Sequence, residues 1–167
     1  GDEALFKANE FGEPQFEIVT RTDGKKWLKV TAPDVEINEK QDCYIVDFVM
    51  KAPLHQPSTV LTTLDLEYDE DLTVSVGEDD IKSSGNRVEA VVNAGDDYLQ
   101  NWSSHGAGMG GKTWQAASIK YIPHSTIANK PLKWCVRVNK NVDMSKFAIY
   151  VSDIELFLPD ESKTVWD

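Results

Sequence analysis

One segment of the chain combines aromatic, amide, imidazole and glycine residues, and it is the strongest candidate for chemistry. It runs from Tyr98 through Trp102 and His105 to Trp114. Tyr98, Gln100 and Trp102 occupy alternate positions, so an extended strand would present all three on one face. Four glycines between 106 and 111 predict a tightly bent or mobile loop that supplies no packing of its own.

Residues of these types suit a sugar ligand. The apolar C–H face of a pyranose stacks on an indole ring, while amide, imidazole and guanidinium groups hydrogen-bond the hydroxyls around its rim. Core packing is the alternative for Trp102 and Trp114, and it applies more strongly to Trp114, whose strand phase is ambiguous. Loop exposure is the alternative for His105. Arg137 and Asp47 point away from the predicted core of their strands, so we count both as candidate ligand contacts.

Motifs of enzymes are largely missing from the sequence. There is no P-loop, dinucleotide fingerprint, HExxH helix or GxSxG elbow. The acidic clusters lie in predicted turns, where we expect solvated carboxylates rather than a metal loop or a catalytic group: 69–71, 78–80 and 96–97. A pair of carboxylates for glycoside hydrolysis can come from distant strands, so a small glycosidase stays open as an alternative. Our expectation is a protein that is not an enzyme.

The elements that must position these residues are strands, because hydrophobic residues recur with a period of two. Leu64, Leu66 and Tyr68 alternate with polar residues, and so do Leu132, Trp134, Val136 and Val138. Such alternation is typical of half-buried antiparallel strands. About ten segments of this kind, separated by turn signals such as Thr22-Asp23-Gly24, predict an all-β fold, a β-sandwich or jelly roll of two stacked antiparallel sheets.

Length and composition predict one domain and limit its partners. The 167 residues carry 17 Lys+Arg and 28 Asp+Glu, a net charge of −11. This excess disfavours nucleic acid and anionic membranes, and no apolar run is long enough to insert into a bilayer. We predict a monomeric module over 1–158 and a polar tail or linker over 159–167, in which Trp166 has no role. The acidic surface favours a neutral ligand over an anionic one such as pectin.

Four segments, in their order, resemble the jelly-roll carbohydrate-binding modules grouped as families four, nine and twenty-two. The first, 23–30, is similar to their turn followed by an L-x-V strand, and 43–52 is similar to Y-x-V-S-F-x-V-K-A. Residues 114–123 resemble W-x-x-x-S-x-x-F-x-V-P, and the pair 132–138 and 147–156 resembles the closing strands, which end F-Y-I-D-D-V-x-L. The resemblance covers most of the chain, from Leu5 to Leu158.

This resemblance implies glycan binding without catalysis. In these modules the concave face of one sheet forms an open cleft in which aromatic side chains stack on a single polysaccharide chain. We therefore expect xylan or xylo-oligosaccharides as the first ligand, with β-glucan or a cellulose chain as the alternative within this class. The resemblance also implies a bacterial protein that is secreted or at the cell surface, with a glycoside hydrolase covalently attached. A purely structural sandwich of a surface protein is the alternative from another class.

Many members of the group bind a structural calcium ion, which the resemblance would assign here to Asp153 and Glu10. The N-terminal motif D-F-E is not matched, because Gly12 stands where its Glu would fall, so Glu10 or Glu13 would have to substitute. Cys43 and Cys135 have no CxxC spacing, and we expect two buried free thiols, with a disulfide as the alternative.

Overall fold

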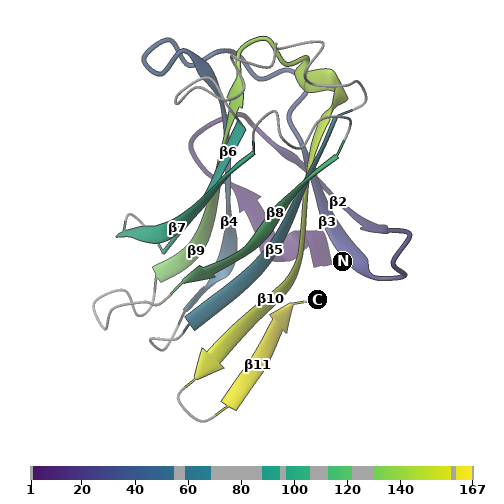
Figure 1. The fold of residues 1–167 in the computed structure, drawn as a ribbon, viewed down its shortest axis with the longest axis vertical. Coiled ribbons are helices and arrows are strands. Elements are labelled where there is room, and N and C mark those ends of the chain that lie inside the picture. Colours follow the sequence, from purple (N-terminus) through teal and green to yellow (C-terminus); the bar gives the residue numbers. More distant parts are fainter. Residues whose placement is uncertain are drawn as a thin grey trace.

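A computed structural model gives the fold as two antiparallel β-sheets packed face to face (Figure 1). The structure describes the backbone of residues 2–54, 59–68, 88–94, 97–105, 113–121, 130–158 and 161–166, and the side chains of 2–51, 62–67, 131–155, 164 and 166. The described elements are two 3-10 turns, η1 (Asp2–Leu5) and η4 (Met144–Lys146), and strands β1 (Phe6–Ala8), β2 (Gln15–Thr20), β3 (Lys26–Thr31), β4 (Cys43–Leu54), β5 (Thr59–Tyr68), β6 (Val88–Ala94), β7 (Asp97–His105), β8 (Thr113–Tyr121), β9 (Lys130–Asn139), β10 (Phe147–Leu158) and β11 (Glu161–Trp166).

Each sheet combines strands from both halves of the chain. The five-stranded sheet, here called sheet A, has the order β1-β4-β9-β6-β7, and the six-stranded sheet B has the order β2-β3-β10-β5-β8, with β11 paired to β10. The prediction of an antiparallel β-sandwich is confirmed. The acidic clusters at 69–71 and 78–80 lie outside the described residues.

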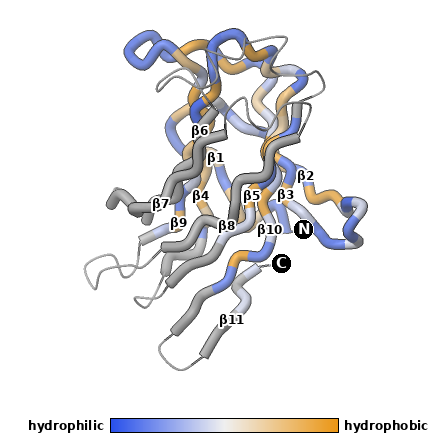
Figure 2. Tube along the Cα trace, in the orientation of Figure 1, coloured by the Kyte–Doolittle hydropathy of each residue, from blue (hydrophilic) through white to orange (hydrophobic). Residues whose placement is uncertain are grey.

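The core lies between the sheets and is built from the apolar phase of the alternating strands. Val46 and Phe48 of β4, Trp134 and Val136 of β9, and Leu66 of β5 are each at most 1% exposed. The Phe48 and Trp134 rings stack with their centroids 5.3 Å apart. Figure 2 shows hydrophobic and hydrophilic residues interspersed along the coloured parts of the strands. Trp134 is therefore a core residue, as its phase predicts.

The C-terminal residues differ from the predicted polar tail. Strand β11 pairs antiparallel with β10, so 161–166 belongs to the sandwich. Trp166 is 5% exposed and packs edge-on against Phe6, with ring centroids 5.5 Å apart. Figure 1 shows β10 and β11 as a hairpin and both chain ends on the same side of the molecule. A polar segment can form a strand when its single large apolar residue fills a gap in the core. One such residue does not produce a detectable periodicity in the sequence.

Cys43 and Cys135 are not joined by a disulfide, and Cys43 is buried whereas Cys135 is half-buried. Cys135 pairs with Asp47 in the register of β4 and β9, four positions along β4 from Cys43. Four residues of a strand span about 13 Å, which is beyond the reach of a disulfide. The expectation of two thiols without a disulfide is confirmed, and the expected burial holds for Cys43 but not for the half-buried Cys135.

No helix in the described part of the chain has the length and hydrophobicity required to span a membrane.

Candidate functional site

Two predicted contact residues with described side chains, Asp47 and Arg137, lie on the outer face of sheet A, the side turned away from the core. Val46, Phe48, Trp134 and Val136 point into the core, so Asp47, Cys135 and Arg137 point outward. The Asp47–Cys135 row continues through Val91 of β6 to Trp102 of β7. The register thus assigns Trp102 to the same face as Asp47, at the edge strand of the sheet.

The neighbouring row of this face runs from Lys7 of β1 through Val49, Lys133 and Asn93 to Tyr98 of β7. Gln100 lies between Tyr98 and Trp102, opposite an irregularity in the register between Val91 and Asn93. The side chains of Tyr98, Gln100 and Trp102 lie outside the described residues. Their grouping on this face stays a prediction, which the backbone register favours.

His105 and Trp114 hold different register positions from Trp102. His105 pairs with Val88, one position beyond the outward row of Glu89 and Ser104, so alternation gives it the opposite face. Trp114 pairs with Leu66 in sheet B, in a row that continues through Ile149 and Val30. These three side chains are at most 1% exposed, so the row belongs to the core. The side chains of His105 and Trp114 also lie outside the described residues.

Arg137 is exposed, Lys133 is half-buried, and Cys135 lies between them on β9. Burial, and the nearby charge of Asp47, raise the pKa of the Cys135 thiol to about 11. The thiol is therefore uncharged at neutral pH and adds no negative charge to this face. Lys133 was not among the predicted contacts, although it shares the outward phase of Arg137, so strand alternation could have found it.

Asp47 faces outward but is covered by the N-terminal segment. Its carboxylate accepts hydrogen bonds from Asn9 Nδ2 at 2.8 Å and from the Phe11 backbone N–H at 2.6 Å. The Asp47 backbone also bonds to Asn9 and Phe11. The side chain is 2% exposed. In this structure Asp47 anchors the chain instead of facing a cleft, and we leave it out of the proposed ligand contacts.

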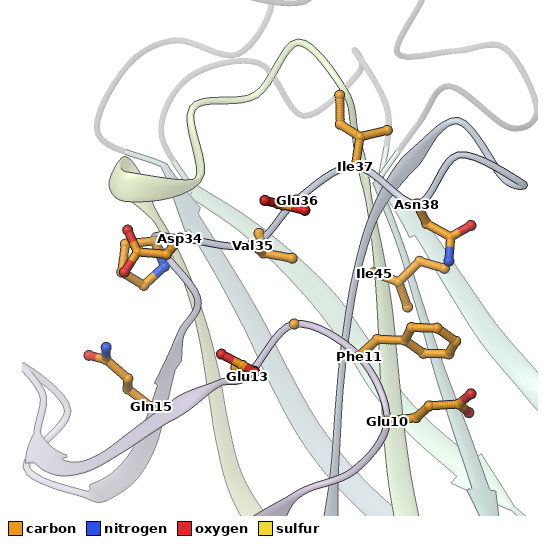
Figure 3. A pocket seen from close by; sticks show the side chains of 12 residues that line it. Glu10, Phe11, Glu13, Gln15, Asp34, Val35, Glu36, Ile37, Asn38 and Ile45 are labelled. Carbon is orange, nitrogen blue, oxygen red and sulfur yellow. The ribbon is translucent and has the colours of Figure 1, made fainter.

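The anchored segment forms one wall of a pocket of about 570 Å³ (Figure 3). The opposite wall is the connection from β3 to β4, with Ile45 of β4 between them. Gly12 has a φ of +86°, and a Cβ atom there would lie 2.8 Å from the Ile45 carbonyl oxygen, so this close approach requires glycine. The charged residues known to line the pocket are all acidic: Glu10, Glu13, Asp34 and Glu36.

Glu10 and Asp153, the two predicted calcium ligands, lie at opposite ends of β3. Asp153 bonds to Lys25 Nζ at 2.9 Å, next to the first residue of β3, whereas Glu10 lines the pocket with Pro33, beyond its last residue. A six-residue strand spans about 20 Å. The pair does not fit one calcium site, and the described residues contain no cluster of three His, Cys, Asp or Glu side chains arranged for a metal. Calcium binding stays an untested prediction.

The outer face of sheet B, by contrast, is filled by its own side chains. Arg21 lies between two aromatic rings, with its guanidinium carbon 4.6 Å from the centroid of Trp27 and 4.2 Å from that of Tyr150. It donates to Asp65 at 2.7 Å and to Glu67. Burial alone would lower the pKa of Arg21, but the two carboxylates raise it above its ordinary value. Trp27 and Tyr150 are 4% and 8% exposed, so neither ring offers a platform for a ligand.

Comparison with solved structures establishes the kind of sandwich. The carbohydrate-binding module TmCBM27, described for specific mannan recognition, matches with a TM-score of 0.52 and 14% identity, over 93% of this chain and 89% of its own. The chain shares the β-sandwich fold of this module. No family model matches the sequence, and neither does any curated protein.

Part of a larger enzyme has a similar fold. The arabinose-bound α-L-arabinofuranosidase MgGH51 matches with a TM-score of 0.55 and 12% identity over 96% of this chain. The chain spans 25% of that enzyme's length. Identities this low relate the folds and leave the ligand to be argued from the site.

Proposed function

We propose that this chain is a non-catalytic carbohydrate-binding module that binds a β-linked polysaccharide on the outer face of sheet A. The observation that carries the proposal is the fold shared with TmCBM27 over nearly the full length of both chains. The register supports the location, because positions 98 and 102 of the edge strand β7 share the outward phase of the exposed Arg137, two strands away on β9. On sheet B, the corresponding face is occupied by Arg21 and its partners.

Xylan is the first proposed ligand, on the resemblance to families four, nine and twenty-two. Trp102 would stack on a pyranose ring for about 1 kcal/mol beyond buried area, and Gln100 and Arg137 would hydrogen-bond its hydroxyls. Affinity from so few contacts would lie between about micromolar and millimolar. A mannan is the second candidate, because TmCBM27 is described as recognising mannan. β-Glucan is the third.

The module would act by targeting an attached catalytic domain. The match to part of an arabinofuranosidase supports a glycoside hydrolase as that domain. Tethering raises the effective concentration of the enzyme at its polysaccharide, so a weak module suffices. Such polysaccharides lie outside cells, so we propose a secreted or cell-surface location.

Native gels containing xylan, galactomannan, β-glucan or pectin test the proposal. We expect xylan to retard the parent chain and Trp102→Ala to abolish the retardation. Trp114→Phe is the matched control, because it changes a tryptophan at a core register position and keeps an aromatic ring there. If none of the gels retards the folded parent, glycan binding is wrong and a structural sandwich remains.

A further inference from the structure

Three basic residues gather on the outer face of sheet A, and we call them the basic strip: Lys7, Lys133 and Arg137. Lys7 and Lys133 flank Val49 in one row of the sheet, which places their Cα atoms about 10 Å apart. Arg137 follows Lys133 on the same face of β9, about 13 Å along the strand. Lys7 and Arg137 are exposed, and Lys133 is half-buried.

The basic strip has no ion pair with any described carboxylate, unlike the basic residues of the hairpin turn and the β9–η4 connection. Arg21, Lys25, Lys26 and Lys140 each contact an aspartate or glutamate. Asp47, the described carboxylate on the same face, already accepts two hydrogen bonds from the N-terminal segment. Glu89 holds the register position opposite Arg137, with its side chain outside the described residues.

The residue between the two cations of β9, Cys135, is uncharged. Cys135 lies between Lys133 and Arg137, and its thiol is protonated at neutral pH. A small anion above Cys135 would meet an ammonium group on one side along β9 and a guanidinium group on the other. The Asp47 carboxylate, which lies opposite Cys135 on β4, is buried and bonded to Asn9 and Phe11. The planar guanidinium can form a bidentate pair with a carboxylate, through two parallel N–H···O hydrogen bonds. A neutral hydroxyl has one oxygen and cannot form this pair.

We propose that the basic strip makes the module prefer a β-linked chain whose side groups carry carboxylates, that is, a polysaccharide with uronic acid branches, with Lys133 and Arg137 as the contact residues. This inference rests on the proposed function and names the ligand class of the same site. The net charge of −11 repels a densely charged polymer such as pectin. Uronic acid branches that are far apart along a neutral chain interact mainly with the nearest charges of the protein, here Lys133 and Arg137, because salt screens the more distant ones. The expected order of affinity is uronic acid-substituted xylan, then neutral xylan, then pectin.

The test compares glucuronoxylan with the same polymer after its carboxylates have been reduced to alcohols, in native gels at low and high salt. We expect the parent to bind glucuronoxylan roughly threefold to tenfold more tightly than the reduced polymer at low salt, with the difference shrinking at high salt. Lys133→Ala should shrink this difference and keep binding to the reduced polymer, because Lys133 is not a proposed contact of the sugar hydroxyls. Lys29→Ala, on the outer face of sheet B, is the control for losing a cation and should leave the difference unchanged.

The outcomes separate this inference from the proposed function. Equal retardation of the parent by both polymers would overturn the selection of carboxylates and leave xylan binding intact. A Lys133→Ala variant that keeps the full preference would also overturn it, because the basic strip would then not be its source. If neither polymer retards the parent but galactomannan or β-glucan does, this inference is wrong and the proposed function stands. If no gel retards the parent, both are wrong. Thermal unfolding of each variant shows that the comparison is made on folded protein.

Discussion

Asp47 lies at an outward position of a strand and is nonetheless 2% exposed. Its two oxygens bind one side-chain amide and one backbone N–H of the segment that connects β1 to β2. A buried carboxylate needs such donors because an unpaired one would lose its hydration without compensation. Asp47 therefore determines where the segment lies, and through it one wall of the pocket.

Asp47→Ala should destabilise the fold by about 1–3 kcal/mol, because it leaves the Phe11 N–H and the Asn9 amide without their acceptor. Denaturant unfolding monitored by tryptophan fluorescence measures the change. Lys140→Ala is the control, since it removes an exposed ion pair with Asp42, which is expected to contribute less than about 1 kcal/mol. A loss no larger than that of the control would contradict the anchoring role.

Strand β11 is the element whose role sequence periodicity does not show. It extends sheet B along the part of β10 that β3 does not reach, since β3 pairs with 149–151 and β11 with 154–158. Trp166 then closes the end of the core against Phe6, with Lys26 Nζ 5.6 Å from its ring centroid. The C-terminal strand therefore links the N-terminal turn to the sandwich.

Trp166→Ala should cost about 3–5 kcal/mol of unfolding free energy, as expected for a buried tryptophan. Thr164→Ala changes an exposed residue of the same strand and should cost far less. Urea titration of both variants measures the difference. Equal, small losses would show that β11 is dispensable and that the module ends near residue 158.

At the scale of the whole molecule, charge acts in two opposite ways as pH falls. With a net charge of −11, the carboxylates of the folded chain repel one another at neutral pH, which destabilises the fold. This repulsion weakens as the pH falls toward the isoelectric point near 4.7. Three carboxylates have pKa values below the ordinary value in the folded state: Asp2 beside Lys26, Asp23 bonded to the Lys25 N–H, and Asp143 bonded to Ser145. Their contribution to stability is complete above the unfolded pKa and is lost as pH falls through the folded one.

The midpoint of thermal unfolding should therefore pass through a maximum near about pH 5 and fall below about pH 4. Added salt should raise the midpoint at pH 7 by screening the acidic surface, and should change it little near pH 5. Differential scanning calorimetry across this range at two salt concentrations measures both effects. A midpoint that rises steadily toward neutral pH, independent of salt, would contradict the role of net charge.

The sequence by itself determined the strands, the core and the fold class, because side-chain alternation is a local property that each strand carries in its own residues. Val46, Phe48 and Trp134 are core residues in the structure, as their phase predicts. Only the tertiary structure decided which outward residues meet. It covered Asp47, separated Glu10 from Asp153, placed Trp166 in the core and left Lys133 and Arg137 beside an uncharged thiol. These outcomes depend on strand order and long-range register, which join residues up to 160 positions apart, Phe6 and Trp166, and which no local pattern encodes.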